Sequence, residues 1–311
     1  MRLSQLMDLS ICPERDTEIA GITCDSRRVL PGWVFVCIRG TAADGHLFAE
    51  KAAAAGAAAI VAERDVGLDC QLLVPSTRIA WARMCAAWFG HPAERLHLIG
   101  ITGTNGKTTT TYLLKAVLEA CGHKVGLIGT IQNMIGDRVL PSGHTTPDPY
   151  DLQSMLSLMA AEGCRYAVME VSSHALDQDR VEGCFFDAAV FTNLTQDHLD
   201  YHGTMERYLQ AKKRLFSICR RAVVNADDPW AGRMVEDVPA EVLRFSCRGA
   251  ADVTAAEIRQ LPDGVAFLLS AGERTAPVHL HIPGLFSVYN AVGAAACALA
   301  LGLPLDRVAA A

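Results

Sequence analysis

The chain has 311 residues, with 28 Lys and Arg against 34 Asp and Glu, a formal charge of −6 at pH 7 and a hydrophobic fraction of 50%. At roughly 100–200 residues per domain this length predicts about two domains, and the half-apolar composition excludes a disordered chain. The acidic balance gives no electrostatic reason to expect nucleic acid as a partner, and the longest apolar runs, 52–62 and 291–303, are shorter than the roughly 18–20 residues of a membrane span.

Residues 1–89 are predicted to form a small α/β domain. Short apolar runs that are typical of strands alternate with Ala-rich helical stretches; the strands are expected at 33–38, 58–61 and 72–74, and the helices at 48–55 and 79–89. Gly90-His91-Pro92 is a turn signal that ends this pattern. We therefore expect a second domain over residues 90–311.

The second domain repeats one unit: an apolar strand, a polar or Gly-rich turn and an amphipathic helix. Strands are expected at 96–101, 125–128, 166–171, 188–191 and 222–225, and helices at 107–121, 150–162 and 204–217. This alternation predicts a mostly parallel sheet with helices on both faces. Shorter alternating segments over 241–282 indicate a few antiparallel strands, followed by a helix from Ser287.

The two ends of the chain and its cysteines indicate its setting. The first residues lack a basic segment followed by an apolar one, so no secretory signal is expected. The 11 Cys form no C-x-x-C pair and mostly lie in apolar runs, which predicts reduced thiols in a cytoplasmic protein. The last residues, 306–311, are helix formers with no Gly, Asn or Pro, which indicates an interruption rather than a natural end.

The segment Gly103-Thr104-Asn105-Gly106-Lys107-Thr108-Thr109 lies between a predicted strand and a predicted helix. In that setting glycines let backbone N–H groups approach phosphate oxygens, Lys107 reaches the β- and γ-phosphates, and the Thr108 hydroxyl can bind Mg²⁺. The strict G-x-x-x-x-G-K-[ST] pattern would need Gly at 101, where Ile stands, so this is a shorter variant. A ligand-free turn is the alternative, but it leaves Lys and Thr at the helix start unexplained.

Glu170 is expected at the carboxyl end of the 166–171 strand, where open α/β sheets place ligand groups. A carboxylate beside a triphosphate is a natural Mg²⁺ ligand, whereas a carboxylate that only caps the next helix is the alternative. On the helix 204–217, Lys212 falls near the centre of an apolar stripe and Lys213 toward its edge. Burial favours a neutral amine, which can react with CO₂; a lysine that extends to solvent is the alternative.

Several further segments resemble the Mur ligases, the ATP-dependent amide-forming enzymes of peptidoglycan precursor synthesis. Beside the loop at 103–109 they are C-D-S-R-R-V at 24–29, H-T-T-P-D at 144–148, M-E-V-S-S-H-A-L at 169–176, N-L-T-Q-D-H-L-D-Y-H at 193–202 and A-K at 211–212. The resemblance spans the chain in order. It implies an N-terminal UDP-precursor-binding domain, a P-loop-type ATPase domain and a C-terminal amino-acid-binding domain, of which the third is absent here.

The resemblance also implies roles for individual residues. ATP would be bound by Gly103, Thr104, Asn105, Gly106, Lys107, Thr108, Thr109 and Asn290. Lys107, Glu170, His198 and Lys212 would be catalytic; Mg²⁺ would be held by Thr108, Glu170, His198 and Lys212, the last as an N6-carboxylysine. The UDP-linked precursor would be bound by Cys24, Ser26, Thr41, Ala42, Ala43, Thr145, Thr146, Ser172, Gln178 and Arg180.

Some of these residues have plainer alternatives. Taken alone, a loop histidine such as His198 is more often structural, but the N-L-T-Q-D-H segment around it favours a ligand role; for Ser26 the alternative is a turn residue. Where many relatives read F-N-V, this chain has Ser287 in place of the Asn, which puts an adenine-side role for position 287 in doubt.

Within the family the likeness is to the enzyme that adds the third, diamino residue of the stem peptide. The implied reaction activates the glutamate carboxylate of UDP-N-acetylmuramoyl-L-alanyl-D-glutamate as an acyl phosphate, which the amine of meso-diaminopimelate or lysine then attacks. Without the third domain, residues 1–311 are expected to act as a monomer that binds the precursor and ligates poorly or not at all. The alternatives are a folylpolyglutamate synthetase-like ligase and a non-catalytic nucleotide-binding module.

Overall fold

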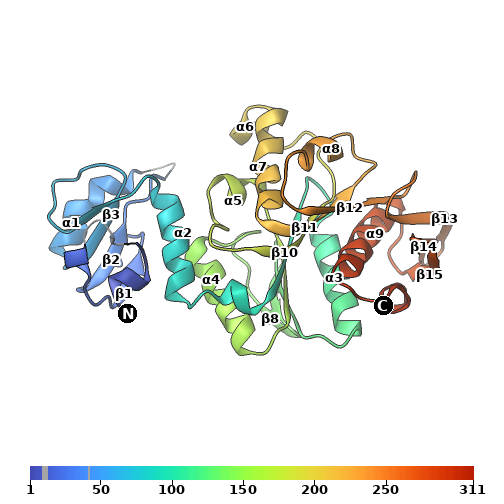
Figure 1. Cartoon of the computed structure of the whole chain (residues 1–311), viewed down its shortest axis with the longest axis horizontal. Coiled ribbons are helices and arrows are strands. Elements are labelled where there is room, and N and C mark those ends of the chain that lie inside the picture. Colours follow the sequence, from blue (N-terminus) through green and yellow to red (C-terminus); the bar gives the residue numbers. More distant parts are fainter. Residues whose placement is uncertain (9–12, 41–42) are drawn as a thin grey trace. The chain divides into compact units, whose positions relative to one another are not determined.

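The computed structural model describes residues 1–8, 13–40 and 43–311. These residues form two compact units (Figure 1). The smaller unit consists of Met1–Pro92 together with Asp148–Ser154 and Gln178–Gly183, and the larger unit holds Ala93–Pro147, Met155–Asp177 and Cys184–Ala311. Two short segments from the middle of the chain therefore pack with the N-terminal residues.

The smaller unit contains a four-stranded parallel sheet among its described residues. Its strands follow chain order as β1 (Gly21–Thr23), β2 (Trp33–Val36), β3 (Ala59–Ala62) and β4 (Gln71–Leu73). Successive residues of a strand point to opposite faces. Val34 accordingly packs with Trp81 of α2 (Thr77–Trp88), while Phe35 packs with Ala52 of α1 (Ala49–Ala54). Both faces of this sheet are therefore covered by helices.

The larger unit is built on a mixed, mostly parallel sheet. In the described residues its order is β15-β14-β13-β12-β11-β10-β5-β9-β6-β7-β8. The parallel strands are β5 (His97–Thr102), β6 (Val125–Ile128), β9 (Tyr166–Glu170), β10 (Phe186–Phe191), β11 (Cys219–Asn225) and β12 (Glu241–Ser246). β5 lies between β9 and β10, so the carboxyl ends of these three strands adjoin. The expected α/β fold class is confirmed.

Antiparallel hairpins extend this sheet at both edges. At one edge are β7 (Asn133–Ile135) and β8 (Arg138–Leu140); at the other are β13 (Val253–Leu261), β14 (Gly264–Ala271) and β15 (Arg274–Leu280). The prediction of antiparallel strands over 241–282 is wrong for β12, which runs parallel to both β11 and β13. Apolar alternation marks a half-buried strand but does not carry the direction of its partner.

The described chain from residue 93 onward holds eight α-helices, and the first residues of one of them, the helix 149–161, belong to the smaller unit. The helices are α3 (Lys107–Ala120), α4 (Pro149–Ala161), α5 (Ser173–Asp177), α6 (Leu199–His202), α7 (Met205–Ser217), α8 (Ala231–Met234), α9 (Leu285–Ala300) and α10 (Leu305–Ala310), and short 3₁₀ turns lie at Leu3–Gln5, Pro13–Arg15, Gly45–Phe48 and Pro92–Arg95. The helix predicted from Ser287 thus begins two residues earlier. Among the described residues, no helix combines the length and the apolar character that crossing a membrane requires.

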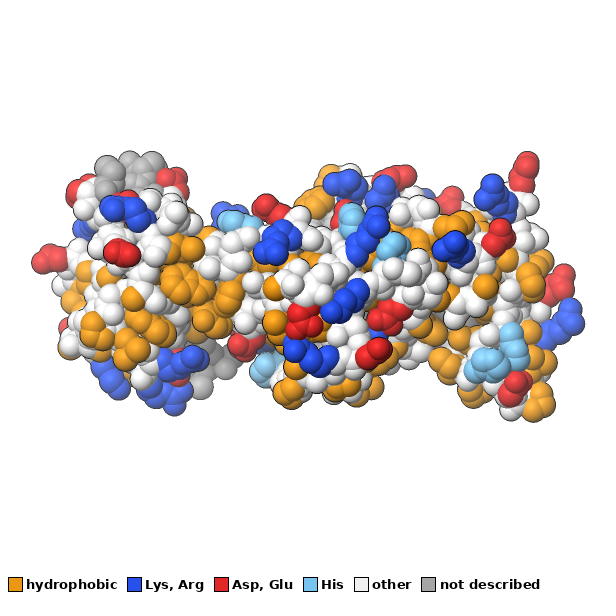
Figure 2. Space-filling view, turned by 90° about the horizontal axis from the view of Figure 1, so that it is seen from below, with side chains coloured by type: hydrophobic (Ala, Val, Ile, Leu, Met, Phe, Trp, Pro, Cys, Tyr) orange, Lys and Arg blue, Asp and Glu red, His pale blue; other side chains and the backbone are white. Residues whose placement is uncertain are grey.

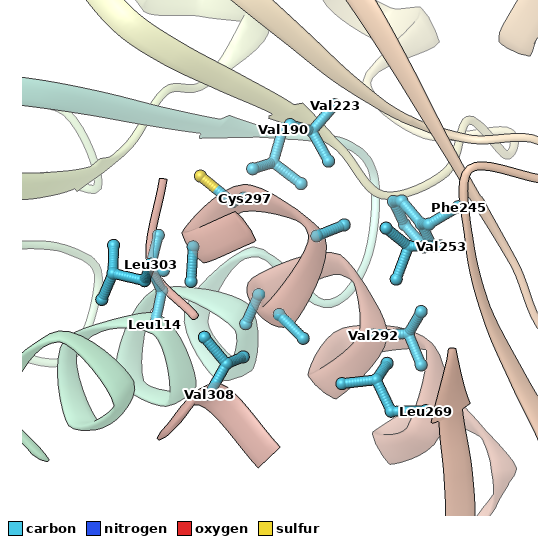
Figure 3. Close-up of a cluster of buried hydrophobic side chains, with 14 of the residues drawn as sticks. Leu114, Val190, Val223, Phe245, Val253, Leu269, Val292, Cys297, Leu303 and Val308 are labelled. Carbon is cyan, nitrogen blue, oxygen red and sulfur yellow. The ribbon is translucent and has the colours of Figure 1, made fainter. Parts of the chain in front are cut away.

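The main core lies where α9 packs between α3 and the sheet. Figure 3 shows α9 with Leu114 of α3 on one side and Val190, Val223 and Phe245 of the sheet on the other. Small residues permit this close approach: a Cβ at Gly293 would lie 3.1 Å from the Phe245 ring. The Ala-rich composition of this helix therefore has a packing reason.

Candidate functional site

The loop at 103–106 connects the carboxyl end of β5 to the start of α3. Gly106 is the N-cap of α3 with φ 85°, and Gly103 has φ 149°. A Cβ at Gly106 would lie 2.3 Å from Asn290 Oδ1, and one at Gly103 would lie 1.9 Å from Thr192 Oγ1. Both glycines are therefore required by backbone conformation and by neighbours, and the loop presents the N-terminus of a helix, which favours anions.

Two lysines contact this loop from different helices. Lys107 Nζ donates to the carbonyl oxygens of Gly103 and Thr104, each over 3.0 Å. Lys212 Nζ of α7 donates to the Gly103 oxygen over 2.9 Å and lies 4.6 Å from the centre of the Tyr208 ring. Lys212 is 1% exposed, in agreement with its predicted place in the buried stripe.

Burial acts on the pKa of both lysines in the same direction. It lowers the pKa of Lys107, against the opposing attraction of the Glu170 and Asp197 carboxylates. It also holds the pKa of Lys212 well below its ordinary value, and the neighbouring Lys107 charge adds to that effect. The neutral amine of Lys212 is favoured for this reason.

Glu170 ends β9 beside the phosphate loop and is 1% exposed. Its carboxylate accepts hydrogen bonds from the Thr108 hydroxyl, 3.0 Å from each oxygen, and from the Thr130 amide and hydroxyl over 2.9 and 3.0 Å. These donors are all neutral. A buried carboxylate in such surroundings offers its charge to a cation, and it already adjoins the Thr108 hydroxyl.

Residues 192–193, which follow β10, hydrogen-bond the phosphate loop at several points. The Asn193 side chain accepts from the Asn105 amide and donates to the Asn105 carbonyl oxygen, both over 3.0 Å. The backbone carbonyl oxygen of Asn193 accepts from the Thr104 amide over 2.8 Å. Thr192 Oγ1 donates to the Asn105 carbonyl oxygen over 2.7 Å. The segment 193–198, which contains His198, therefore also has a structural role at its first residue.

His198 lies in a group of aromatic rings rather than against Glu170. It adopts φ 52° at the start of α6, and its side chain is 47% exposed. Its ring centre is 4.8 Å from that of His174 and 6.2 Å from that of Tyr208. Tyr208 links this group to the loop, because its hydroxyl hydrogen-bonds Thr104 Oγ1 over 3.2 Å. Among the predicted site residues, Thr108 and Glu170 are therefore hydrogen-bonded to each other. His198 and Lys212 both lie next to the Tyr208 ring.

The T-T-P segment packs against the residues that follow β9. Thr146 Oγ1 donates to the Glu170 carbonyl oxygen over 2.8 Å and accepts from the Ser172 amide over 3.0 Å. Ser172 Oγ accepts from the Ala175 amide in the first turn of α5. The Thr145 hydroxyl donates to Thr130 Oγ1 over 3.0 Å, since the Thr130 hydrogen is given to Glu170. Thr145 and Ser172 therefore flank the Glu170 site, while Thr146 is buried and holds the two segments together.

The remaining predicted precursor-binding residues belong to the smaller unit. Arg180 donates to Gln178 Oε1 over 2.9 and 3.2 Å and pairs with Asp148 over 3.2 Å. Ser26 lies in the turn after β1, two residues beyond Cys24, which is exposed. The Ala43 carbonyl oxygen accepts from the Gly40 amide. Thr41 and Ala42 lie outside the described residues.

A pocket of about 570 Å³ adjoins the phosphate loop. Asn105, Gly106 and Asn290 line it together with residues to which sequence reasoning gives no binding role: Thr192, Asn193, Thr195, Asn225, Asp227, Asp228, Pro229, Phe245, Arg248, Phe286 and Tyr289. The Ser287 hydroxyl donates to backbone carbonyl oxygens at the start of its own helix, including those of Ile282 and Pro283. It is therefore engaged locally rather than directed into the pocket.

Thr130 and Tyr208 are further residues of the site that sequence reasoning misses. Thr130 follows β6 and donates twice to Glu170, and the available signal is its place at the carboxyl end of a predicted strand, the edge where Glu170 also lies. Tyr208 appears in the sequence only as part of the apolar stripe of α7. Its hydroxyl contact to Thr104 depends on the neighbouring loop and has no local signal.

Two family profiles together match most of the chain. A profile described as the Mur ligase middle domain matches residues 101–298, and one described as the catalytic domain of the Mur ligase family matches residues 18–83. The chain belongs to the Mur ligase family. The middle-domain match includes the phosphate loop, Glu170, His198 and Lys212.

Relatives with similar sequences are named as Mur ligases. Proteins named UDP-N-acetylmuramoyl-L-alanyl-D-glutamate–2,6-diaminopimelate ligase from Caldanaerobacter subterraneus and Geobacillus kaustophilus are each 47% identical, over 94% of this chain and 62% of their own length. A solved structure of a ligase with that name superimposes with a TM-score of 0.88 at 30% identity, covering 100% of this chain and 66% of that one. This Mur ligase chain thus spans about two thirds or less of these proteins.

The fold extends beyond peptidoglycan enzymes. A folylpolyglutamate synthase from Mycobacterium tuberculosis superimposes with a TM-score of 0.63 at 19% identity, over 75% of this Mur ligase chain. At that identity the likeness concerns the fold alone.

Proposed function

We propose that this chain carries the precursor-binding and ATP-binding parts of a ligase that joins a diamino acid to UDP-N-acetylmuramoyl-L-alanyl-D-glutamate. The observation that carries the proposal is the pair of lysines on the phosphate loop, with Lys212 buried and Glu170 nearby. A module that only binds nucleotide has no need of a buried lysine there. The names of the 47% identical relatives favour 2,6-diaminopimelate as the diamino acid.

The donor set at Glu170 fits Mg²⁺. This cation prefers oxygen ligands and usually takes one or two carboxylates together with substrate phosphates. Glu170 and Thr108 supply a buried carboxylate and a hydroxyl within 3.0 Å of each other. When bound, Mg²⁺ would neutralise phosphate charge, and His198 together with a carboxylated Lys212 would hold a second ion.

The residues of the chain would act mainly by position and charge. Backbone N–H groups of the loop and the α3 N-terminus would bind phosphate oxygens, and Lys107 would leave the Gly103 and Thr104 carbonyls to contact the β- and γ-phosphates. The precursor carboxylate would attack the γ-phosphorus, forming an acyl phosphate and ADP. The amine of the diamino acid would then displace inorganic phosphate and lose a proton as the amide forms.

Lys212 would be carboxylated before it takes part. Its neutral amine adds to CO₂, giving a carbamate with one negative charge and releasing one proton. The carbamate nitrogen keeps one N–H, so the hydrogen bond to the Gly103 oxygen is compatible with the modification.

Precursor binding is assigned to residues of both predicted domains, 1–89 and 90–311. Ser26, Cys24 and the 41–43 loop would contact the uridine diphosphate end. Thr145, Ser172, Gln178 and Arg180 would contact the muramoyl dipeptide, and Arg180 is suited to a bidentate carboxylate contact. Asn290, which lies against Gly106, would bind on the nucleotide side.

One experiment separates this function from its alternatives. The 311-residue chain is mixed with Mg²⁺, ATP and either the UDP-muramoyl dipeptide or a reduced folate, and hydroxylamine is added to trap acyl phosphate. ADP and hydroxamate formed only with the UDP-linked acceptor support the proposal. Hydroxamate formed with folate alone identifies the synthetase-like alternative. The same assay is run on a form extended by the last domain of the relatives. If both forms bind ATP and precursor tightly and neither gives hydroxamate, the non-catalytic module is identified.

A further inference from the structure

A second group of metal-ligating side chains lies at the edge of the larger sheet, far along it from the phosphate loop. His279 belongs to β15, and His281 follows that strand by one residue. Residues i and i+2 of a strand point to the same face. Asp263 lies in the turn between β13 and β14. Figure 2 shows histidine side chains next to an acidic one over this end of the larger unit.

The strand register brings the turn to the histidines. Ala266 pairs with His279 and Val265 pairs with Leu280, so the start of β14 runs alongside the end of β15. Gly264, with φ 159°, makes the approach possible, because a Cβ there would lie 2.0 Å from the Leu280 carbonyl oxygen and 3.0 Å from His281 Cα. The backbone therefore holds the Asp263 turn against the two histidines.

The ligand atoms are close together. His279 Nε2 lies 3.5 Å from Asp263 Oδ1, and His281 Nδ1 lies 3.7 Å from Asp263 Oδ2. The two ring centres are 4.4 Å apart, and one ligand atom from each residue lies within 4.8 Å of the other two. All three side chains are exposed. Apolar burial does not explain this grouping, and an exposed ion pair contributes little to stability.

We propose that Asp263, His279 and His281 bind one divalent transition-metal ion of the Ni²⁺ and Zn²⁺ class. In a tetrahedral site with bonds of about 2.0–2.2 Å, neighbouring ligand atoms lie about 3.4 Å apart. Each histidine nitrogen lies near this distance from a different oxygen of the Asp263 carboxylate, at 3.5 and 3.7 Å, so an ion between the imidazoles would be bound by that carboxylate through one or both of its oxygens. Two imidazoles and one carboxylate suit these metals, whereas Mg²⁺ prefers an all-oxygen set.

This site is separate from the nucleotide site. β15 is at the end of the strand order, with β14, β13, β12, β11 and β10 between it and β5. A bound ion would connect the β13–β14 turn to the end of β15 and stabilise this edge of the sheet by mass action. The inference therefore does not depend on the proposed ligase activity.

Calorimetric titration of the tag-free chain with Ni²⁺ or Zn²⁺ tests the site. Saturating Mg²⁺ and a non-hydrolysable ATP analogue are present throughout, so that the nucleotide site is occupied. We expect one ion per chain, an affinity at least tenfold lower in His279→Ala, His281→Ala and Asp263→Asn, and a metal-induced rise in Tm that these variants lose.

His97→Ala is the matched control. Its imidazole is also exposed and pairs with a carboxylate, that of Asp187, over 2.8 Å. We expect this variant to bind the ion as the wild type does. Equal affinity in the wild type and a His279→Ala, His281→Ala double variant overturns the proposal, as does a wild type that binds no ion beyond the nucleotide site.

Discussion

Lys107 and Lys212 donate hydrogen bonds to one and the same oxygen, the carbonyl of Gly103, over 3.0 and 2.9 Å. Two ammonium groups at one acceptor repel each other, so a positive charge on one amine disfavours protonation of the other. Lys212 is the deeper of the two, and its pKa is held well below the ordinary value. The pair therefore favours one charged amine at the helix start and one neutral amine on α7, which is the state that reacts with CO₂.

Removal of the Lys212 amine should abolish acyl-phosphate formation. On the proposed function, Lys212→Ala is expected to reduce the rate at least about 100-fold, because it removes the carbamate that would help hold the second Mg²⁺ beside the phosphates, and short carboxylic acids should restore part of it. Lys213→Ala, on the adjacent and less buried position, is the control and should keep the wild-type rate. Full activity of Lys212→Ala would rule out the carbamate.

The lowered pKa of Lys212 should make stability depend on pH. Between its folded pKa and its unfolded value of about 10.4, the unfolded chain binds more protons than the folded chain, so the free energy of unfolding rises with pH across that interval. Lys212→Met removes this contribution. Thermal denaturation without added bicarbonate should show a smaller rise in Tm with pH for Lys212→Met than for the wild type or Lys213→Met, and parallel curves would contradict the buried neutral amine.

The two ends of α3 offer a matched pair of glycines. Gly106 and Gly122 have φ 85° and 89°, but a Cβ at Gly106 would meet Asn290 Oδ1 at 2.3 Å, whereas one at Gly122 meets nothing within 4 Å. Gly122→Ala should cost about 1–2 kcal/mol of stability for the left-handed backbone alone and leave nucleotide affinity unchanged. Gly106→Ala should cost more and weaken binding of an ATP analogue.

The Asn290 contact can be separated from the backbone effect at Gly106. If the extra cost comes from Asn290, the Gly106→Ala, Asn290→Ala double variant should recover much of the added loss of stability, measured by urea denaturation. Equal destabilisation by Gly106→Ala and Gly122→Ala would show that the Asn290 side chain gives way freely.

Glu170→Gln should uncouple nucleotide binding from Mg²⁺. The amide keeps a hydrogen-bonding oxygen near Thr108 and Thr130 but removes the charge that attracts a cation. We expect the affinity for an ATP analogue to fall at least about tenfold with Mg²⁺ present, and to change little without it. Glu162→Gln, whose carboxylate pairs on the surface with Arg138 and Lys124, should bind the analogue like the wild type.

The features of this site that can be predicted from the sequence are those that depend on residues within a single helix or strand. The burial of Lys212 follows from its neighbours on one helix, and the place of Glu170 follows from the end of one apolar strand. The order of strands and helices is likewise visible in local apolar patterns, which is why the α/β class and most elements agree with the structure.

The unpredicted features depend on partners that are remote in sequence. The direction of β12 relative to β11 and β13 depends on how the chain connects these strands. The sequence of β12 itself carries no signal of that direction. Thr130 contacts Glu170 across 40 positions of sequence, and no spacing rule connects them. The position of His198 beside His174 and Tyr208 also arises from three separate elements that only the fold brings together.

The hydrogen bonds between Asn193 and the phosphate loop have a consequence for ligand affinity. A Gly-containing loop normally loses conformational entropy when a ligand orders it. Here Asn193 and Thr192 hold Thr104 and Asn105 through backbone groups, so that entropy is lost when the chain folds rather than when phosphate binds. Folding stability and nucleotide affinity are thereby linked, and a substitution at Asn193 would weaken binding by letting the empty loop move.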